Sequence, residues 1–108
     1  MVGDAPAAIA FARKALAIDS VPADRGHALA VLGDAFALAG DSSDAEAAYR
    51  EAVDILESEA RWRPAANACR AWGNLLRASG REAEAMDALD RAAELGTRAT
   101  PQHARSER

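Results

Sequence analysis

The sequence has few of the residues that fill a large hydrophobic core. Only 5% of its 108 residues are aromatic, and alanine makes up much of the half that is hydrophobic. Alanine fills little volume, but it is the strongest helix former and allows helix backbones to approach closely. β-Branched residues are also scarce, so the composition predicts an all-α fold. A chain of this length is one small domain or a piece of a longer array.

Three further shortages exclude classes of protein. Basic residues are outnumbered by acidic ones, 13 to 17, whereas nucleic-acid binding normally needs a basic face, so we expect no direct contact with nucleic acid. No uninterrupted apolar run approaches the roughly 18 residues that span a bilayer, and we expect no membrane partner. A single cysteine, Cys69, excludes an internal disulfide, and the first residues lack the basic leader of a signal peptide. These observations favour a cytoplasmic protein.

The chain repeats itself along its length. A shift of 40 residues aligns residues 29–52 with residues 69–92 and matches side chains of similar polarity. Each copy reads as two helices joined by a short turn, and the matched positions are expected to pack the helices together. The matched pairs are Leu32 and Trp72, Gly33 and Gly73, Phe36 and Leu76, Ala45 and Ala85, Tyr49 and Leu89, and Ala52 and Ala92.

Glycines mark the expected helix ends. Gly40 and Gly80 stand where a helix C-terminus takes a left-handed residue, a conformation that glycine adopts without steric cost. Gly96 is expected to end the last helix in the same way.

Two serines are expected to begin helices. Ser43 with Glu46, and Ser79 with Glu82, have the Ser-x-x-Glu spacing of a capping box. From these signals we predict helices near residues 5–18, 24–39, 43–59, 63–79 and 82–95, followed by a polar, aperiodic tail.

The spacing of these residues resembles the tetratricopeptide repeat (TPR), whose usual pattern is W-x2-L-G-x2-Y followed by A-x3-F-x2-A. The sequence departs from that pattern in having Leu29 or Cys69 in place of the tryptophan, and in its longer repeat. The two copies are Leu29-x2-Leu32-Gly33-x2-Phe36 then Ala45-x3-Tyr49-x2-Ala52, and Cys69-x2-Trp72-Gly73-x2-Leu76 then Ala85-x3-Leu89-x2-Ala92.

The resemblance implies five antiparallel helices in a short right-handed superhelix. The implied parts are the second helix of a preceding, truncated repeat (1–22), two TPR-like repeats (23–61 and 62–96) and a flexible polar tail (97–108). Residues 61–96 also resemble the C-terminal repeats of actinobacterial transcriptional regulators that carry a helix-turn-helix domain. This implies a non-catalytic protein- or peptide-interaction module in a larger bacterial regulator, although such repeats serve many partners.

Polar side chains follow one side of the fourth predicted helix. Arg63, Asn67, Arg70, Asn74 and Arg77 recur at steps of four and three residues, which keeps them on one face. In TPR proteins the first helix of each repeat lines a concave groove that receives peptides. The groove residues implied by the resemblance are His27, Asp34, Asn67, Arg70, Asn74 and Arg77.

The implied groove suits an acidic or carboxylate-bearing peptide. Arg70 and Asn74 match the basic residue and the asparagine, four apart, that hold a peptide's C-terminal carboxylate in the TPR family. The preceding repeat has Ala30 and Asp34 instead, so the full clamp is not present, and Asp34 is placed to pair with Arg70 across the groove. The alternative is an ordinary solvated face, which is also our interpretation of the many acidic residues in 41–59 and 82–94.

The first predicted helix has two apolar sides. One side can pack on the following helix, and the other would meet a helix of its own repeat that the sequence does not contain. The alternative function is therefore a structural segment that forms homo-oligomers through this helix, unless an alanine-rich helix simply tolerates the exposure. The two sides carry Ile9, Ala12 and Leu16, and Phe11, Ala15 and Ile18.

No arrangement of residues suggests catalysis. His27 and His103 lie far apart, and Cys69 has no histidine at a spacing typical of a catalytic base or a zinc pair. We therefore expect no enzyme activity, no cofactor and no metal. Cys69 and Trp72 are expected to pack in the core, and Trp62 to fasten the fourth helix onto the third.

Overall fold

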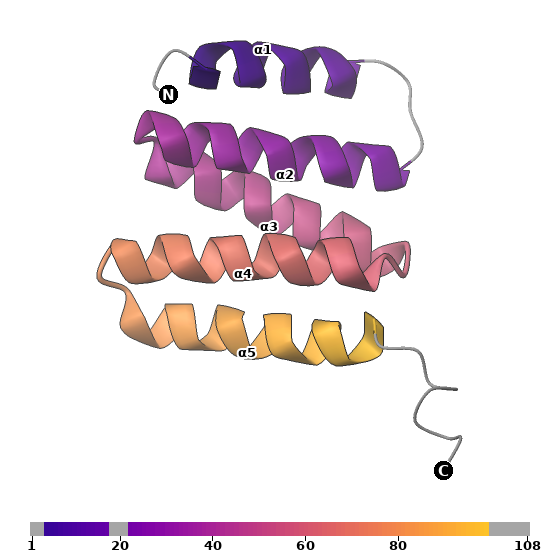
Figure 1. Ribbon diagram of the computed structural model, residues 1–108, viewed down its shortest axis with the longest axis vertical. Coiled ribbons are helices and arrows are strands. Elements are labelled where there is room, and N and C mark those ends of the chain that lie inside the picture. Colours follow the sequence, from indigo (N-terminus) through magenta and orange to yellow (C-terminus); the bar gives the residue numbers. More distant parts are fainter. Residues whose placement is uncertain (1–3, 18–21, 100–108) are drawn as a thin grey trace.

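The computed structural model describes residues 4–17 and 22–99 (Figure 1). Within these ranges all regular elements are helices: α1 (Asp4–Ala17), α2 (Pro22–Ala39), α3 (Ser42–Ser58), α4 (Trp62–Ala78) and α5 (Glu82–Ala99). Each helix packs against the next one in the sequence, and α2 also touches α4. The predicted all-α class is confirmed for the described residues.

The most extensive packing joins α2 to α3, and α4 to α5. In the turn between α2 and α3, Gly40 has a φ of 88°, and the N–H groups of Gly40 and Asp41 donate to the carbonyl oxygens of Ala37 and Phe36. Gly80 has a φ of 81° in the matching turn between α4 and α5. A Cβ would be strained at such angles, so the two glycines end α2 and α4 as the sequence predicts.

The turn between α3 and α4 has the same hydrogen bonds without a glycine. Ala60 has a φ of 57°. Its N–H donates to the carbonyl oxygen of Glu57 at 2.9 Å, and the N–H of Arg61 donates to that of Leu56 at 2.8 Å. A left-handed alanine costs about 1–2 kcal/mol, so this turn is strained where its two counterparts are relaxed.

One predicted helix end is wrong. Gly96 lies inside α5, which continues to Ala99. Beyond it, the hydroxyl of Thr97 donates to the carbonyl oxygen of Ala93, as in a continuing helix. Glycine permits a left-handed turn without imposing one, so a helix can pass through it at a modest cost.

The predicted capping boxes are also wrong. Asp41, not Ser43, is the N-cap of α3, and it makes no side-chain cap hydrogen bond. Ser79 is the C-cap of α4, and its hydroxyl donates to the carbonyl oxygen of Leu75. One residue separates each turn glycine from the next helix, so the cap position falls there and neither serine occupies it.

Small residues bring paired helices close together. A Cβ added to Gly33 of α2 would lie 2.7 Å from the ring of Tyr49 in α3. A Cβ on the repeat-related Gly73 of α4 would lie 2.7 Å from Leu89 in α5. The remaining matched residues are buried except Trp72, which like Leu89 is partly buried: Leu32, Phe36, Ala45, Ala52, Leu76, Ala85 and Ala92.

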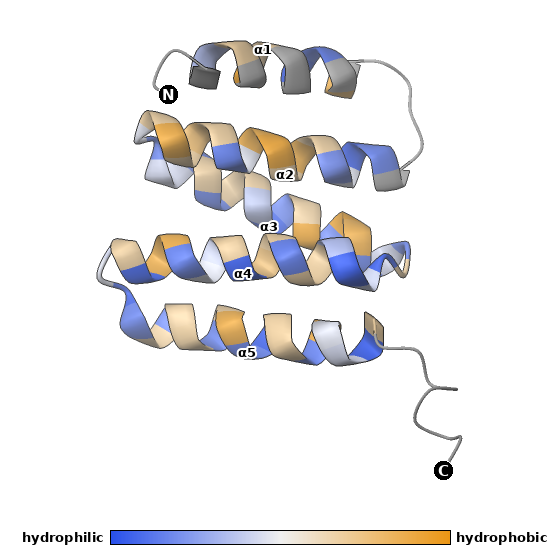
Figure 2. Cartoon of the chain, viewed as in Figure 1, coloured by the Kyte–Doolittle hydropathy of each residue, from blue (hydrophilic) through white to orange (hydrophobic). Residues whose placement is uncertain are grey.

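α1 packs on α2 through Ile9 and Leu16, which lie against the hydrophobic core. In the 40-residue shift these residues match Tyr49 and Leu56 of α3. α2 thus contacts α1, α3 and α4, and hydrophobic residues follow much of its length in Figure 2. Self-association through the other side of α1 stays a prediction. The side chains outside the described residues are those of Phe11, Ala12, Ala15 and Ile18.

Candidate functional site

A groove of about 350 Å³ lies between α2 and α4. Its floor is formed by Tyr49 and Leu56 of α3. Its walls are mostly small or apolar, and Ala30 of α2 and Ala71 of α4 are among them. The polar and charged side chains at its walls are those of His27, Asp34, Arg63 and Asn67.

Asp34 is held in place by a tyrosine from below the groove. The Tyr49 ring is 3% exposed and passes beneath Gly33. Its hydroxyl donates a hydrogen bond to Oδ1 of Asp34, which is exposed. Burial, together with this hydrogen bond and the charge of Asp34, raises the pKa of Tyr49. The hydroxyl therefore stays protonated and keeps donating across the physiological pH range.

The second repeat lacks this arrangement. Asn74 stands at the position of Asp34, and Leu89 at the position of Tyr49. Gly73 still admits the leucine side chain, but no hydroxyl reaches the groove side of α4. The carboxylate and its tyrosine are therefore particular to the repeat whose first helix forms one wall of the groove.

The other groove charge is Arg63, in the first turn of α4. Its side chain is exposed, and no carboxylate among the described residues pairs with it. The partial positive charge at the N-termini of α2 and α4 adds to the positive potential at this end. His27 lies close by in the first half of α2 and is also exposed.

Only part of the predicted polar stripe of α4 lines the groove. Asn67 lines the groove, whereas Arg70, Asn74 and Arg77 are exposed but do not line it. At 100° per residue, Arg70 lies only about 20° around α4 from the groove-lining Arg63, and Arg77 about 40°. Steps of three and four residues therefore do not distinguish the polar residues that line the groove from those that do not. His27 and Asp34 of α2 do line the groove.

The predicted pair between Asp34 and Arg70 is not formed. Asp34 accepts from Tyr49, and Nη1 of Arg70 donates to Oδ1 of Asn67 at 3.2 Å. The guanidinium of Arg70 thus finds its partner on its own helix. The groove is therefore not closed by an ion pair across it.

Ion pairs on the opposite side of α4 connect the two repeats. Arg81 binds Glu46 of α3 through two contacts, Nη1 to Oε1 at 2.8 Å and Nη2 to Oε2 at 3.2 Å. Arg81 also pairs with Glu84. The hydrogen bond from Arg81 and the charges of Arg81 and Arg50 lower the pKa of Glu46. The indole N–H of Trp72 is buried and makes no full hydrogen bond. It lowers the pKa of Glu46 a little further.

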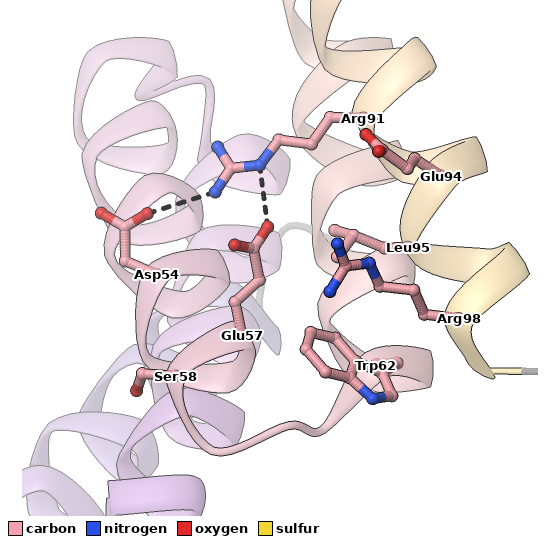
Figure 3. Close-up of a pocket in the computed structure, with 8 residues that line it drawn as sticks. All are labelled: Asp54, Glu57, Ser58, Trp62, Arg91, Glu94, Leu95 and Arg98. Carbon is pink, nitrogen blue, oxygen red and sulfur yellow. Dashed lines mark hydrogen bonds and ion pairs between the residues drawn. The ribbon is translucent and has the colours of Figure 1, made fainter.

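A second arginine bridge crosses a pocket of about 510 Å³ between α3 and α5 (Figure 3). Nε of Arg91 lies 2.9 Å from Oε2 of Glu57, and Nη2 lies 3.4 Å from Oδ1 of Asp54. At one end of the pocket the guanidinium of Arg98 lies over the ring of Trp62, 5.1 Å from its centroid.

These ion pairs correct the interpretation of the acidic residues as a purely solvated face, because several of them bind Arg81, in the turn before α5, or Arg91 of α5. Sequence spacing gives no signal for these bridges, since partners more than 30 residues apart meet only through the packing of the two repeats. Each carboxylate in these bridges is paired with an arginine. The bridges therefore join the repeats and leave little unpaired charge that could bind a ligand.

Cys69 lies in the core, at the position that the sequence predicts for it. Its Sγ is fully buried and donates to the carbonyl oxygen of Ala88 at 3.2 Å. Burial raises the pKa of the thiol, which keeps it protonated and a poor nucleophile. The side chain of Trp72, on α4, is partly buried. The guanidinium of Arg50 lies 5.7 Å from the centroid of its ring.

Comparison with known proteins adds no relative: no protein-family model, curated protein or solved structure matches the chain. None of the described helices is both long and apolar enough to cross a membrane. Among the described residues, no group of three or more His, Cys, Asp or Glu side chains is placed to hold a metal ion.

Proposed function

We propose that this chain is a non-catalytic interaction module that binds a peptide segment of a protein partner in the groove between α2 and α4. The observation that carries the proposal is the groove itself. It combines an apolar floor, small walls that leave room for a peptide, and two exposed charges without an ionic partner in the described residues. Such a surface provides both burial and directional contacts for an extended chain.

We further propose that the helices form a TPR-like superhelix, with residues 1–22 as the second helix of a preceding repeat. Three observations support this. The 40-residue repeat pairs α2 with α3, and α4 with α5. Gly33 and Gly73 make equivalent close approaches. Ile9 and Leu16 of α1 occupy the positions of Tyr49 and Leu56 in α3. The role as a segment of a larger bacterial transcriptional regulator rests on the sequence resemblance alone.

Peptide display against the whole chain tests the proposed function. Ala30→Arg and Ala71→Arg each place a long side chain in the groove from one wall, since both alanines line it and are only partly buried. Peptides selected on the unmodified protein should lose binding to both variants. They should keep binding to Ala93→Arg, a matched change at an exposed position of α5.

Circular dichroism should show the same helicity and melting for all of these proteins. Selected peptides that bind the two groove variants as well as the unmodified chain would show that the groove is not the binding site. Failure to select any peptide would count against the module itself.

A further inference from the structure

The two groove charges lie at different levels along parallel helices. α2 and α4 run in the same direction (Figure 1). Arg63 is the repeat equivalent of residue 23 of α2, eleven residues before Asp34, so we take the two charges to be offset by that length along the groove. Eleven residues of α-helix span roughly 16 Å. The groove is therefore polarised, with its positive charge at the N-terminal ends of the two helices and its negative charge more than two turns further along.

Each of these charges can still bind a ligand. The partner of Asp34 is the neutral hydroxyl of Tyr49, which fixes the carboxylate but does not neutralise it. Tyr49 itself cannot turn away, because its ring is buried against Gly33. Arg63 has no ionic partner in the described residues. A fixed carboxylate costs little reorganisation when a cation binds it.

We infer that the groove is selective for an extended peptide segment that carries one acidic and one basic side chain four residues apart. The acidic side chain binds Arg63, and the basic side chain binds Asp34. This inference rests on the proposed function and names the chemistry of its ligand. In an extended chain, residues four apart lie on the same side and are separated by about 13 Å. The lengths of the two side chains cover the rest of the distance.

The arrangement disfavours a purely acidic peptide. Such a ligand would need a second free cation in the groove, but Arg70 and Arg77 do not line it. Arg70 is also engaged by Asn67. The carboxylate of Asp34 would repel an acidic side chain near the far end of the groove, and that repulsion lowers affinity as effectively as a missing contact.

The test uses labelled nine-residue peptides on one neutral background, with fluorescence anisotropy as the measurement. The peptides carry Glu-x3-Lys, Glu-x3-Glu, Lys-x3-Lys, or Glu and Lys two residues apart. The unmodified protein should bind Glu-x3-Lys about tenfold more tightly than each of the others, since a charge-assisted hydrogen bond contributes about that factor. Added salt should reduce the difference.

Charge-reversal variants make the test specific. Asp34→Lys should shift the preference to Glu-x3-Glu, and Arg63→Glu should shift it to Lys-x3-Lys. Both side chains are exposed, so neither change threatens the fold. Tyr49→Phe removes only the hydroxyl, and should weaken Glu-x3-Lys severalfold while leaving Glu-x3-Glu unchanged.

The outcomes separate the inference from the proposed function. A preference of the unmodified protein for Glu-x3-Glu, or an unchanged order of affinities in the reversal variants, overturns the inference. If all of the peptides bind equally and Ala30→Arg abolishes binding, the groove still binds peptides and only its charge selectivity is refuted. If no peptide binds and display yields none, both the inference and the proposed function fail.

Discussion

Replacing Gly33 by alanine tests whether the tyrosine beneath the groove is as tightly held as the structure indicates. The added Cβ would lie 2.7 Å from two atoms of the Tyr49 ring. The ring is 3% exposed and has no room to move. Overpacking of this kind costs about 1–3 kcal/mol, and the better helix propensity of alanine returns about 1 kcal/mol. We therefore expect Gly33→Ala to destabilise the protein by about 1 kcal/mol.

Two matched glycine-to-alanine substitutions provide a comparison for the stability change at Gly33. Gly73→Ala places a Cβ 2.7 Å from Leu89, but Leu89 is partly exposed and its branched end can rotate aside. At Gly73 the gain in helix propensity and the cost of displacing Leu89 should nearly cancel. A Cβ at Gly96 meets nothing within 4 Å, so Gly96→Ala should stabilise the protein by up to about 1 kcal/mol. From the most to the least stable variant, the order should be Gly96→Ala, Gly73→Ala, Gly33→Ala.

Urea unfolding followed by circular dichroism measures the three free energies of unfolding on one protein background. A change of 1 kcal/mol corresponds to a melting shift of about 4–8 °C for a domain of this size. Gly33→Ala should also weaken binding of the Glu-x3-Lys peptide, because a displaced Tyr49 no longer fixes Asp34. Stabilisation of Gly33→Ala to the level of Gly96→Ala would refute the tight contact and the fixed carboxylate together.

Three other changes test separate features. Ala60→Gly should stabilise the protein by about 1 kcal/mol in thermal or urea unfolding, because it relieves the positive φ in the turn between α3 and α4; no gain would mean that this turn is not left-handed. Glu46→Gln should lower stability at pH 7, and the difference from the unmodified protein should shrink as the pH falls below 4.5 through the lowered pKa of Glu46. A constant difference across that range would exclude the ion pair with Arg81 as its cause. Cys69 should react with a thiol reagent only after unfolding, so rapid labelling of the native protein would contradict its burial.

Features set by backbone conformation and close packing could be predicted from the sequence. Gly40 and Gly80 have the positive φ that only glycine adopts readily, so their spacing revealed two turns. Gly33 and Gly73 are costly inside a helix, and that cost indicated a close approach of neighbouring helices. The turn at Ala60 gave no such signal, because alanine is common throughout the chain and does not mark a left-handed position.

The candidate site was only partly predictable, because its extent depends on how neighbouring helices pack. His27, Asp34 and Asn67 were assigned to the groove, and they line it. Arg70 and Arg77 were assigned to it as well, but they do not line it, although they follow the groove-lining Arg63 at steps of seven residues. Residue spacing does not show how far along α4 the groove extends, because the packing of α2 and α4 sets that extent. The hydrogen bond from Tyr49 to Asp34 has the same origin, since a core position gave no reason to expect a hydroxyl at the groove.

The arginine bridges of Arg81 and Arg91 have a consequence for how such a module can change. Within the described residues, α3 and α5 make no close backbone contact, and these side chains span the gap between them. These ion pairs therefore supplement the core in holding α3 and α5 at their present separation. Since α4 lies between this surface and the groove, we expect a shorter or absent bridge to change the angle between the repeats and the width of the groove. We therefore expect substitutions on the outer surface to alter the proposed binding groove, with every residue that lines it unchanged.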